Sequence, residues 1–413
     1  MQLLHTQRRA ETQGPRLAAP AMSIAGADGA DIMARAQAVA AVAAAHAADV
    51  DRNARFPGEA IAALRAQRLM GILVPADLGG EGAEISTVVD VCYILGRACA
   101  ASAMIYAMHQ IMVACLVRHG RTSAWHCGLL RKLCAEQLLL ASSTTDGQGG
   151  GDLRSSTAAV ERDGTRINLT KSATVVSYGG EADAIVTTAR RAPDAPPSDQ
   201  VLVAFLKADY RLERTLEWDA LGMRGTCSAG FTLTAAGDGD QVLPQPYKHI
   251  LAHTMMPVAH LTWGAVWAGV AAAAVERARG FVRGAARKTN GQLPPGAAHL
   301  TRANASLRTL RGIVASALDR FAMLGADREA LEAIEFQTAM NLLKVNASET
   351  AVATVMSALR ACGLMGYRND SEFSVGRHLR DILSAPIMIN NDRILANVES
   401  ATLLMDVPAT LTD

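Results

Sequence analysis

The sequence predicts an α+β protein with several domains, in which two helical regions flank a central β region. Alanine-rich helix formers dominate residues 32–49, and a helical pattern returns from about residue 247 to the end of the chain. Between these regions, short segments rich in Val, Ile, Leu and Thr alternate with turn residues such as Arg162-Asp-Gly164. With 413 residues, the chain is long enough for two or three domains.

The first helical region spans residues 28–138, which we assign to an N-terminal α-helical domain. Pro57 lies near the first turn of one predicted helix, which ends at Gly71. Two further helices are expected at residues 85–100 and 103–119. The first residues lack the apolar core of a secretory signal, so residues 1–27 are predicted to be a disordered tail. Met22 is an alternative start within this tail.

Residues 139–246 form the predicted β domain, and residues 247–413 form a C-terminal helical domain with four or five long helices. Several short strands at close spacing predict a small barrel or sandwich. The expected strands are residues 138–143, 156–162, 166–170, 184–189, 200–207 and 230–234. The expected breaks between the C-terminal helices are residues 290–297, 324–327 and 363–372.

The composition argues against several classes of protein. The 40 basic and 39 acidic residues give a net charge of +1, which offers no electrostatic basis for binding nucleic acid or a membrane surface. The seven cysteines are scattered without a CxxC pair, so we predict reduced thiols, no disulfides and no metal site. We find no uncharged apolar run of the ~18 to 20 residues that a membrane helix needs. A cytoplasmic protein is therefore expected.

The most informative loop is Thr145-Asp-Gly-Gln-Gly-Gly-Gly-Asp152, at the start of the β region. Glycines allow sharp turns and a close approach of the backbone to a ligand, while hydroxyl and amide groups supply hydrogen bonds. Such a loop can also be a plain surface connection. Its surroundings favour the interpretation as a ligand-binding loop.

Five motifs in order resemble those of the acyl-CoA dehydrogenase family. They are Leu73-Val-Pro-Ala-Asp-Leu-Gly-Gly-Glu-Gly82, the Thr145–Asp152 loop, Gly179-Gly-Glu-Ala-Asp-Ala-Ile-Val186, Trp218-Asp-Ala-Leu-Gly-Met-Arg-Gly-Thr226, and a C-terminal pair made of Leu359-Arg-Ala-Cys-Gly-Leu-Met-Gly-Tyr367 and Arg377-His-Leu-Arg-Asp381. The resemblance implies an N-terminal α-helical domain, a middle β-barrel and a C-terminal four-helix bundle. It also implies FAD bound between barrel and bundle, with a neighbouring subunit completing the site, in a homotetramer or dimer.

The resemblance implies a set of cofactor-binding positions, some of which depart from the family pattern. Thr145 and Ser177 correspond to the two flavin-contacting hydroxyls, although Ser177 is also a plausible strand-end hydroxyl bonded to the backbone. Val175 replaces the tryptophan beside the flavin, and Gly151 replaces a serine of the loop. The complete set is Thr145, Asp146, Gly151, Val175, Ser177, Arg287, Arg360 and Gly363, with Arg287 or Lys288 and Arg360 as candidate partners of the pyrophosphate.

The catalytic base is the clearest departure. α,β-Dehydrogenation needs a desolvated carboxylate within reach of the substrate. In most of the family this is a Glu just before the last helix, and here Asn390 occupies that position. Asp392 is the nearest carboxylate, but it can equally belong to the cap of the final helix. His260 is a second candidate at the alternative position used by some members, and it can equally be a buried helical histidine.

These departures leave two chemistries and one non-catalytic interpretation open. We predict FAD-dependent α,β-dehydrogenation of an acyl thioester such as an acyl-CoA, with a non-standard base and an electron-transfer protein as acceptor. The alternative is a flavin-dependent oxygenase or monooxygenase that uses O2, in which His109 supplies a donor near the flavin. A subunit that only binds CoA esters or a partner flavoprotein is the third possibility.

Overall fold

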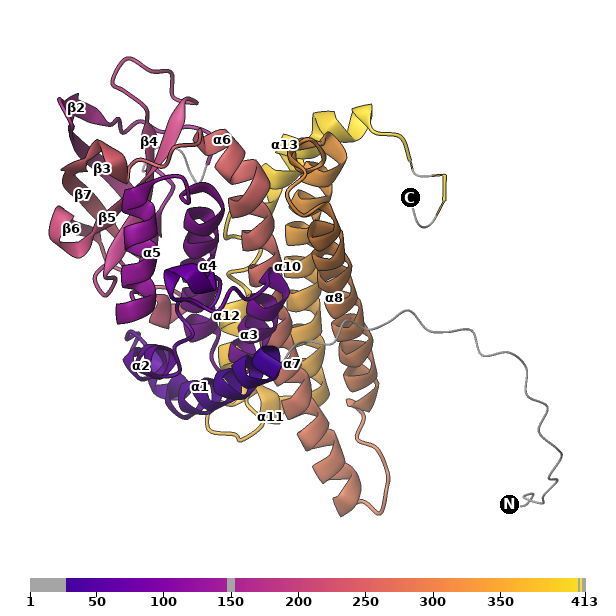
Figure 1. Ribbon diagram of the computed structural model, residues 1–413. Helices are drawn as coiled ribbons and strands as arrows, with labels where there is room; N and C mark the ends of the chain where they lie inside the picture. Colours follow the sequence, from indigo (N-terminus) through magenta and orange to yellow (C-terminus); the bar gives the residue numbers. More distant parts are fainter. Residues whose placement is uncertain (1–26, 147–152, 408, 411–413) are drawn as a thin grey trace.

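The computed structural model describes residues 27–146, 153–407 and 409–410, so almost all of the predicted tail at residues 1–27, together with Gly151, lies outside the described residues. Within that range, helices come first, strands follow and helices return (Figure 1). The N-terminal helices are α1 (Ala27–Arg52), α2 (Gly58–Ala66), η1 (Ala76–Leu78), α3 (Ile85–Ala98), α4 (Ala100–His119) and α5 (Ala124–Glu136).

The predicted β domain is confirmed, and its strands form two sheets. The strands are β1 (Leu140–Ser143), β2 (Glu161–Asp163), β3 (Arg166–Val176), β4 (Ala184–Arg190), β5 (Gln200–Leu206), β6 (Tyr210–Leu216) and β7 (Ala229–Asp238). One sheet has the order β1-β4-β5 with β1 and β4 parallel, and the other has the order β2-β3-β7-β6. Strands β4 and β5 are buried almost throughout, whereas β3 alternates between buried and exposed residues, as expected of a sheet with one solvated face.

The sequence did not predict strand β6, and it ended β3 too early. Most β6 residues are exposed, and Arg211, Glu213 and Arg214 give it the charged character of an edge strand. Such a strand lacks the apolar signal on which the prediction depended. A register shift between Ala173 and Val176 bends the end of β3, which is where the flavin-contacting residues were expected.

The C-terminal domain is built on three long helices, α7 (Met256–Lys288), α8 (Ala297–Leu324) and α10 (Ile334–Cys362), which run side by side in Figure 1. The shorter α13 (Asn391–Leu404) packs against α10 and completes the bundle. A π-helical segment, η5 (Leu251–Met255), joins α6 (Tyr247–Ile250) to α7. The remaining short elements are α9 (Arg328–Glu332), α11 (Leu364–Tyr367), α12 (Gly376–Ile382), η2 (Lys207–Asp209), η3 (Arg224–Thr226) and η4 (Gly239–Gln241).

Helix α7 is the common core of the two helical domains. It packs against α10 on one side and against α3 of the N-terminal domain on the other. A Cβ on Gly269 would lie 2.4 Å from the Tyr93 carbonyl oxygen, and one on Gly96 would lie 2.5 Å from that of Val266. The two glycines therefore let the backbones of α3 and α7 approach closely, which fixes the domains against each other.

The prediction that no apolar run is long enough to span a membrane needs correction. Two helical stretches in the described residues, Ala100–His119 and Tyr247–Lys288, meet that requirement by length and hydropathy. Their most apolar windows are 89% and 94% buried inside the protein. Both stretches are thus core helices of the folded chain, and their apolar character is used in packing against other elements.

Candidate functional site

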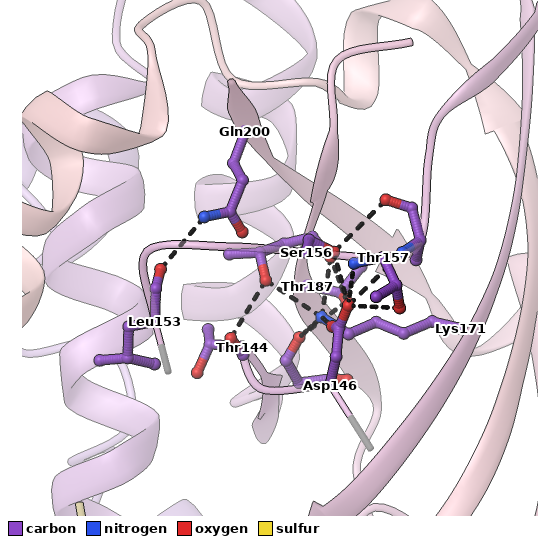
Figure 2. Close-up of polar contacts among 11 residues, drawn as sticks. Thr144, Asp146, Leu153, Ser156, Thr157, Lys171, Thr187 and Gln200 are labelled. Carbon is purple, nitrogen blue, oxygen red and sulfur yellow. Dashed lines mark hydrogen bonds and ion pairs between the residues drawn. The ribbon is translucent and has the colours of Figure 1, made fainter. Parts of the chain in front are cut away.

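Asp146 follows β1, in the loop that the sequence marked as a ligand-binding loop. Its carboxylate is buried and accepts hydrogen bonds from Ser156 Oγ (2.9 Å), Thr157 Oγ1 (3.0 Å) and the backbone N–H of Thr157. Lys171 Nζ from β3 lies 2.9 Å from the other carboxylate oxygen (Figure 2). Burial alone would raise the pKa of Asp146, but the Lys171 ammonium and these donors lower it, so the carboxylate is ionised.

The Lys171 ammonium group joins the two sheets of the β domain. Besides Asp146, it donates to the carbonyls of Ser143 (2.9 Å) and Thr188 (2.8 Å) and to Thr188 Oγ1 (3.0 Å). The Asp146 side chain was predicted to bind the cofactor, yet its described contacts are with Lys171 and with the side chains and backbone of residues 156–158. In this structure Asp146 therefore anchors the loop, and the neighbouring Thr145 is left half-buried.

The end of β3 carries the other two predicted flavin neighbours. Val175 is 41% exposed, unusual for a valine in a strand, so it presents an apolar surface at the position that the sequence predicted to lie beside the flavin. Ser177 is buried, and its hydroxyl lies 2.8 Å from Ser228 Oγ, which in turn lies 2.7 Å from Thr226 Oγ1. Ser177 therefore belongs to a chain of three hydroxyls. The alternative interpretation from the sequence was a hydrogen bond from this hydroxyl to the backbone.

Asn390 caps the last helix. Its side-chain oxygen accepts from the backbone N–H of Asp392 at 2.9 Å, which is the usual role of asparagine before a helix. Asp392 itself is exposed in the first turn of α13, where a carboxylate interacts favourably with the helix dipole. Neither residue has the surroundings of a desolvated base.

A buried lysine fixes the linker that leads to this cap. Lys344 on α10 is fully buried, and its Nζ donates to Asn391 Oδ1 at 2.7 Å and to the Ile389 carbonyl at 3.2 Å. Burial lowers the pKa of Lys344 to about 8, against a raising effect of Glu349. Sequence reasoning missed both Lys344 and Asn391, because a lysine in an amphipathic helix pattern is usually solvated.

His109 is a structural histidine in α4. Its Nε2 lies 2.8 Å from the Met70 carbonyl oxygen, to which it donates, and its Nδ1 accepts from the Leu140 N–H at 3.0 Å. Burial lowers the pKa of His109 to about 4, so the ring is neutral. Because both nitrogens already have backbone partners, the geometry argues against His109 as a donor to a bound flavin.

His260 is also buried and neutral. Its Nδ1 lies 2.8 Å from the Met340 carbonyl, an arrangement in which Nδ1 carries the proton. Burial lowers the pKa of His260 to about 4, which makes it a weak base at neutral pH. Its role in this structure is to tie α7 to α10.

Two of the sequence motifs meet at the junction of all three domains. A Cβ on Gly222 would lie 2.0 Å from the Arg380 carbonyl oxygen, so only glycine permits this contact. Asp381 is buried and accepts from the Met223 N–H at 2.7 Å, while Arg380 pairs with Asp51 of α1. Burial raises the pKa of Asp381 to about 6. These motif residues hold the domains together.

An open cavity of ≈580 Å³ lies at the same junction. Its lining is strongly basic and includes Arg52, Arg224, Arg277, Arg377 and Arg380, with Asp51 as the acidic member. The arginines come from distant parts of the chain, so sequence spacing gave no signal for the cavity.

The comparisons with known proteins decide the family. Residues 31–137 match the model of the acyl-CoA dehydrogenase N-terminal domain, and residues 251–398 match that of the acyl-CoA dehydrogenase C-terminal domain. The chain belongs to the acyl-CoA dehydrogenase family. It is accordingly a flavoprotein oxidoreductase, and the predicted order of helical, β and helical domains is confirmed.

Individual members of the family differ in activity. The chain is 26% identical over 379 residues to the probable acyl-CoA dehydrogenase fadE25 of Mycobacterium leprae, covering 87% of this chain and 91% of the relative. It is also 26% identical over 360 residues to the amino sugar nitrososynthase DnmZ of Streptomyces peucetius, covering 83% and 85%. The structure of KijD3 with FMN and a dTDP-linked amino sugar has a TM-score of 0.78 at 22% identity, covering 94% and 96%.

Several described residues fit the flavin that this family uses. Thr145 and the exposed Val175 offer a hydroxyl and an apolar surface. Ser102 on α4 and Trp263 on the contacting helix α7 each bury a polar atom that has no hydrogen-bond partner among the described residues. Buried polar atoms normally have partners, so a water molecule or a bound ligand would satisfy these two. Neither was singled out from the sequence.

The remaining predicted cofactor residues lie at one end of the bundle. Arg287 is exposed in the last turn of α7, and Arg360 is exposed in the last turn of α10. Gly363 follows the last residue of α10. Gly363 has a φ of +55°, which favours glycine at the end of α10. A Cβ on Gly296 would lie 2.7 Å from the Ala361 carbonyl oxygen, which shows that the loop after α7 packs against this end.

Proposed function

We propose that the protein is a flavin-dependent oxygenase that acts on a small organic metabolite with reduced flavin and O2. The observation that supports this proposal is that the buried carboxylates already have partners within the protein. Among the described residues, Asp146 and Asp381 are the buried ones, and each is engaged, by Lys171 and by the Met223 N–H. Asn390 occupies the position of the family base as a helix cap. Proton abstraction from an unactivated acyl thioester lacks a suitable group there.

FAD is the form of flavin that the motif resemblance supports, with FMN as the alternative because KijD3 is described in complex with FMN. The flavin supplies the redox chemistry, and the chain supplies Thr145, Ser177 and the Val175 surface around it. The basic residues Arg287 and Arg360 suit the pyrophosphate of FAD.

A homotetramer or dimer fits the family pattern in which a second subunit reaches the flavin. Leu293, Leu364 and Tyr367 are strongly exposed near the same end of the bundle as the two arginines. Exposed apolar side chains grouped in this way are typical of interaction surfaces.

Dehydrogenation remains the second candidate, because the match to fadE25 extends over most of both chains. It suits a substrate whose α-proton is already acidic, for which a strong carboxylate base is not required. An electron-transfer protein would then accept the electrons.

Anaerobic mixing of the flavin-loaded protein with a panel of acyl-CoAs distinguishes the two chemistries. An oxygenase leaves the oxidised-flavin absorbance unchanged, and its chemically reduced form incorporates isotopically labelled O2 into the product. Loss of the oxidised-flavin absorbance with acyl-CoA alone would contradict the proposal and establish dehydrogenation.

Asn390→Glu tests whether the fold still presents a base at this position. We expect simple acyl-CoAs to reduce the oxidised-flavin absorbance of this variant but not that of the wild type. Asn390→Gln is the matched control, since it has the same length without the charge. Equal behaviour of the two variants would mean that residue 390 does not face the substrate.

Thr145→Val tests the cofactor site. Thr144→Val is its control, because Thr144 accepts a hydrogen bond from Thr188 Oγ1 through its backbone carbonyl. Weaker flavin retention or a shifted flavin spectrum is expected for Thr145→Val alone. An unchanged spectrum and affinity in that variant would remove Thr145 from the site.

A further inference from the structure

Three side chains that the flavin chemistry does not use converge at the start of the C-terminal domain. His249 lies in α6, His253 in the π-helical segment η5, and Glu332 at the end of α9. His249 Nδ1 lies 2.6 Å and His253 Nε2 lies 2.7 Å from the same oxygen, Glu332 Oε1. The two imidazole rings have centroids 5.6 Å apart. All three potential donor atoms lie within 4.8 Å of one another.

This convergence is unusual for ordinary surface pairing. One carboxylate oxygen accepts from two imidazoles, which requires both rings to direct an N–H at it. Replacing these protons by a single cation turns both nitrogens and the oxygen into ligands around one point. Metal-bound nitrogen and oxygen atoms lie about 2.0 to 2.2 Å from zinc, which places tetrahedral ligands roughly 3.3 to 3.6 Å apart. Each nitrogen–oxygen separation, now 2.6 or 2.7 Å, would therefore widen by roughly 0.6 to 1 Å on metal binding.

The positions of the donors are fixed by their surroundings. Gln337 of α10 donates to the carbonyls of Ala252 (3.0 Å) and Leu331 (2.6 Å), each next to one of the three residues. His119 stacks on the His253 ring at 6.4 Å and is itself held by Gln245 and Thr254. Both ends of the cluster are thus tied to the same glutamine, as expected for a preorganised ligand set.

The cluster is open to solvent on one side. The His253 side chain is 6% exposed, whereas those of His249 and Glu332 are 36% and 45% exposed. They border an open hollow of ≈640 Å³, which Arg328 and Glu329 also line. This leaves room for a water molecule as a further ligand and gives an ion a route of entry.

We propose that His249, His253 and Glu332 bind a divalent transition-metal ion, with Zn2+ the best fit. Two imidazole nitrogens and one carboxylate oxygen are a common zinc set, in which water completes the tetrahedron. The ion links α6 and η5, which lead into the core helix α7, to α9 between α8 and α10. The proposal concerns this connection alone and does not depend on the flavin chemistry.

Zn2+ titration of the full-length, flavin-loaded protein after dialysis against a chelator tests the proposal, with a chromogenic chelator as competitor. We expect one equivalent to bind, and His249→Ala and Glu332→Gln each to weaken the affinity at least about tenfold, the usual minimum for loss of one ligand. Both changes are at partly exposed residues, so the variants should fold. Co2+ gives a second readout, since its visible absorption reports tetrahedral coordination.

His46→Ala is the matched control. His46 Nδ1 lies 3.5 Å from Glu59 Oε1, so this change removes a histidine–carboxylate contact that has no second histidine. The control should retain wild-type Zn2+ affinity and the rise in melting temperature on adding Zn2+, which His249→Ala should lose. Equal Zn2+ affinity of the wild type and Glu332→Gln, or no binding by the wild type against the competitor, would overturn the proposal. A lower melting temperature without a metal response would mean that the cluster is only hydrogen-bonded.

Discussion

The β domain and the C-terminal bundle each bury one lysine completely, and the two differ in what surrounds the charge. Lys171 in β3 faces the ionised carboxylate of Asp146 and three neutral acceptors. Lys344 in α10 instead faces neutral groups, which are the Asn391 side chain, the carbonyls of Pro386 and Ile389, and the Trp267 ring. Each lysine anchors a segment that the sequence had marked as functional, the 145–152 loop and the linker before α13.

The difference shows how a buried charge is tolerated in two ways. An ion pair compensates desolvation by Coulomb attraction, and removing one partner leaves the other charge buried and unpaired. Burial lowers the pKa of both lysines, and for Lys344, where neutral acceptors take the place of the carboxylate, the pKa falls to about 8. Substitutions can test this contrast directly.

Lys171→Met should have the largest effect, because it leaves the Asp146 carboxylate without its cation. We expect a loss of roughly 3 to 5 kcal/mol in the free energy of unfolding, measured by urea denaturation, and a loss of flavin retention. The double variant Lys171→Met/Asp146→Asn should recover part of this loss. A double variant no more stable than the single one would contradict the role given to the unpaired charge.

His109 extends the comparison to a buried group that is neutral. Its pKa of about 4 in the folded protein lies below the ordinary value of 6.5, so the unfolded chain takes up a proton first as the pH falls. The His109 contribution, at most about 3 kcal/mol, is present above pH ~6.5 and is lost as the pH falls towards 4. Unfolding of the wild type and His109→Gln at pH 7.5 and 5 should show a smaller pH dependence in the variant. An equal dependence would contradict this assignment.

Lys344→Met should cost less than Lys171→Met, about 1 to 3 kcal/mol, because it leaves only neutral acceptors unpaired. The pH dependence gives a sharper test. The folded protein releases this proton near pH 8 and the unfolded chain near 10.5, so this group makes the wild type gain stability as the pH rises between those values. The variant should lack that gain, as measured by thermal unfolding at pH 7.5 and 9.5. Retention of the full gain would mean that another group causes it.

Asn390→Ala should have the smallest effect, a loss of about 1 kcal/mol from the missing helix cap. Asn390→Asp should retain stability, because a carboxylate also accepts from the Asp392 N–H. Circular dichroism with urea unfolding measures both. If Asn390→Ala were as harmful as Lys344→Met, the cap would be more important to the linker than the buried lysine.

The sequence by itself determined the family, the domain order and most strands, because these depend on local patterns and on motifs that are contiguous in the chain. It also singled out two segments as parts of a site, the loop after β1 and the linker before α13, and this stays a prediction. Strand β6 was not predicted, because an exposed, charged edge strand lacks the apolar pattern on which strand prediction depends. The division of the strands into two sheets came from the structure, because strand content alone does not determine which strands pair.

Only the tertiary structure decided the roles of individual side chains. Asp146, His109 and Asn390 carry the right chemistry in the sequence, but their partners come from residues 10 or more positions away or from the start of a helix. The histidine–glutamate cluster likewise joins two histidines four residues apart to a glutamate 79 residues beyond the second. Hydrogen bonds and ion pairs act over a few ångströms in space, and sequence spacing does not record such distances once the chain has folded.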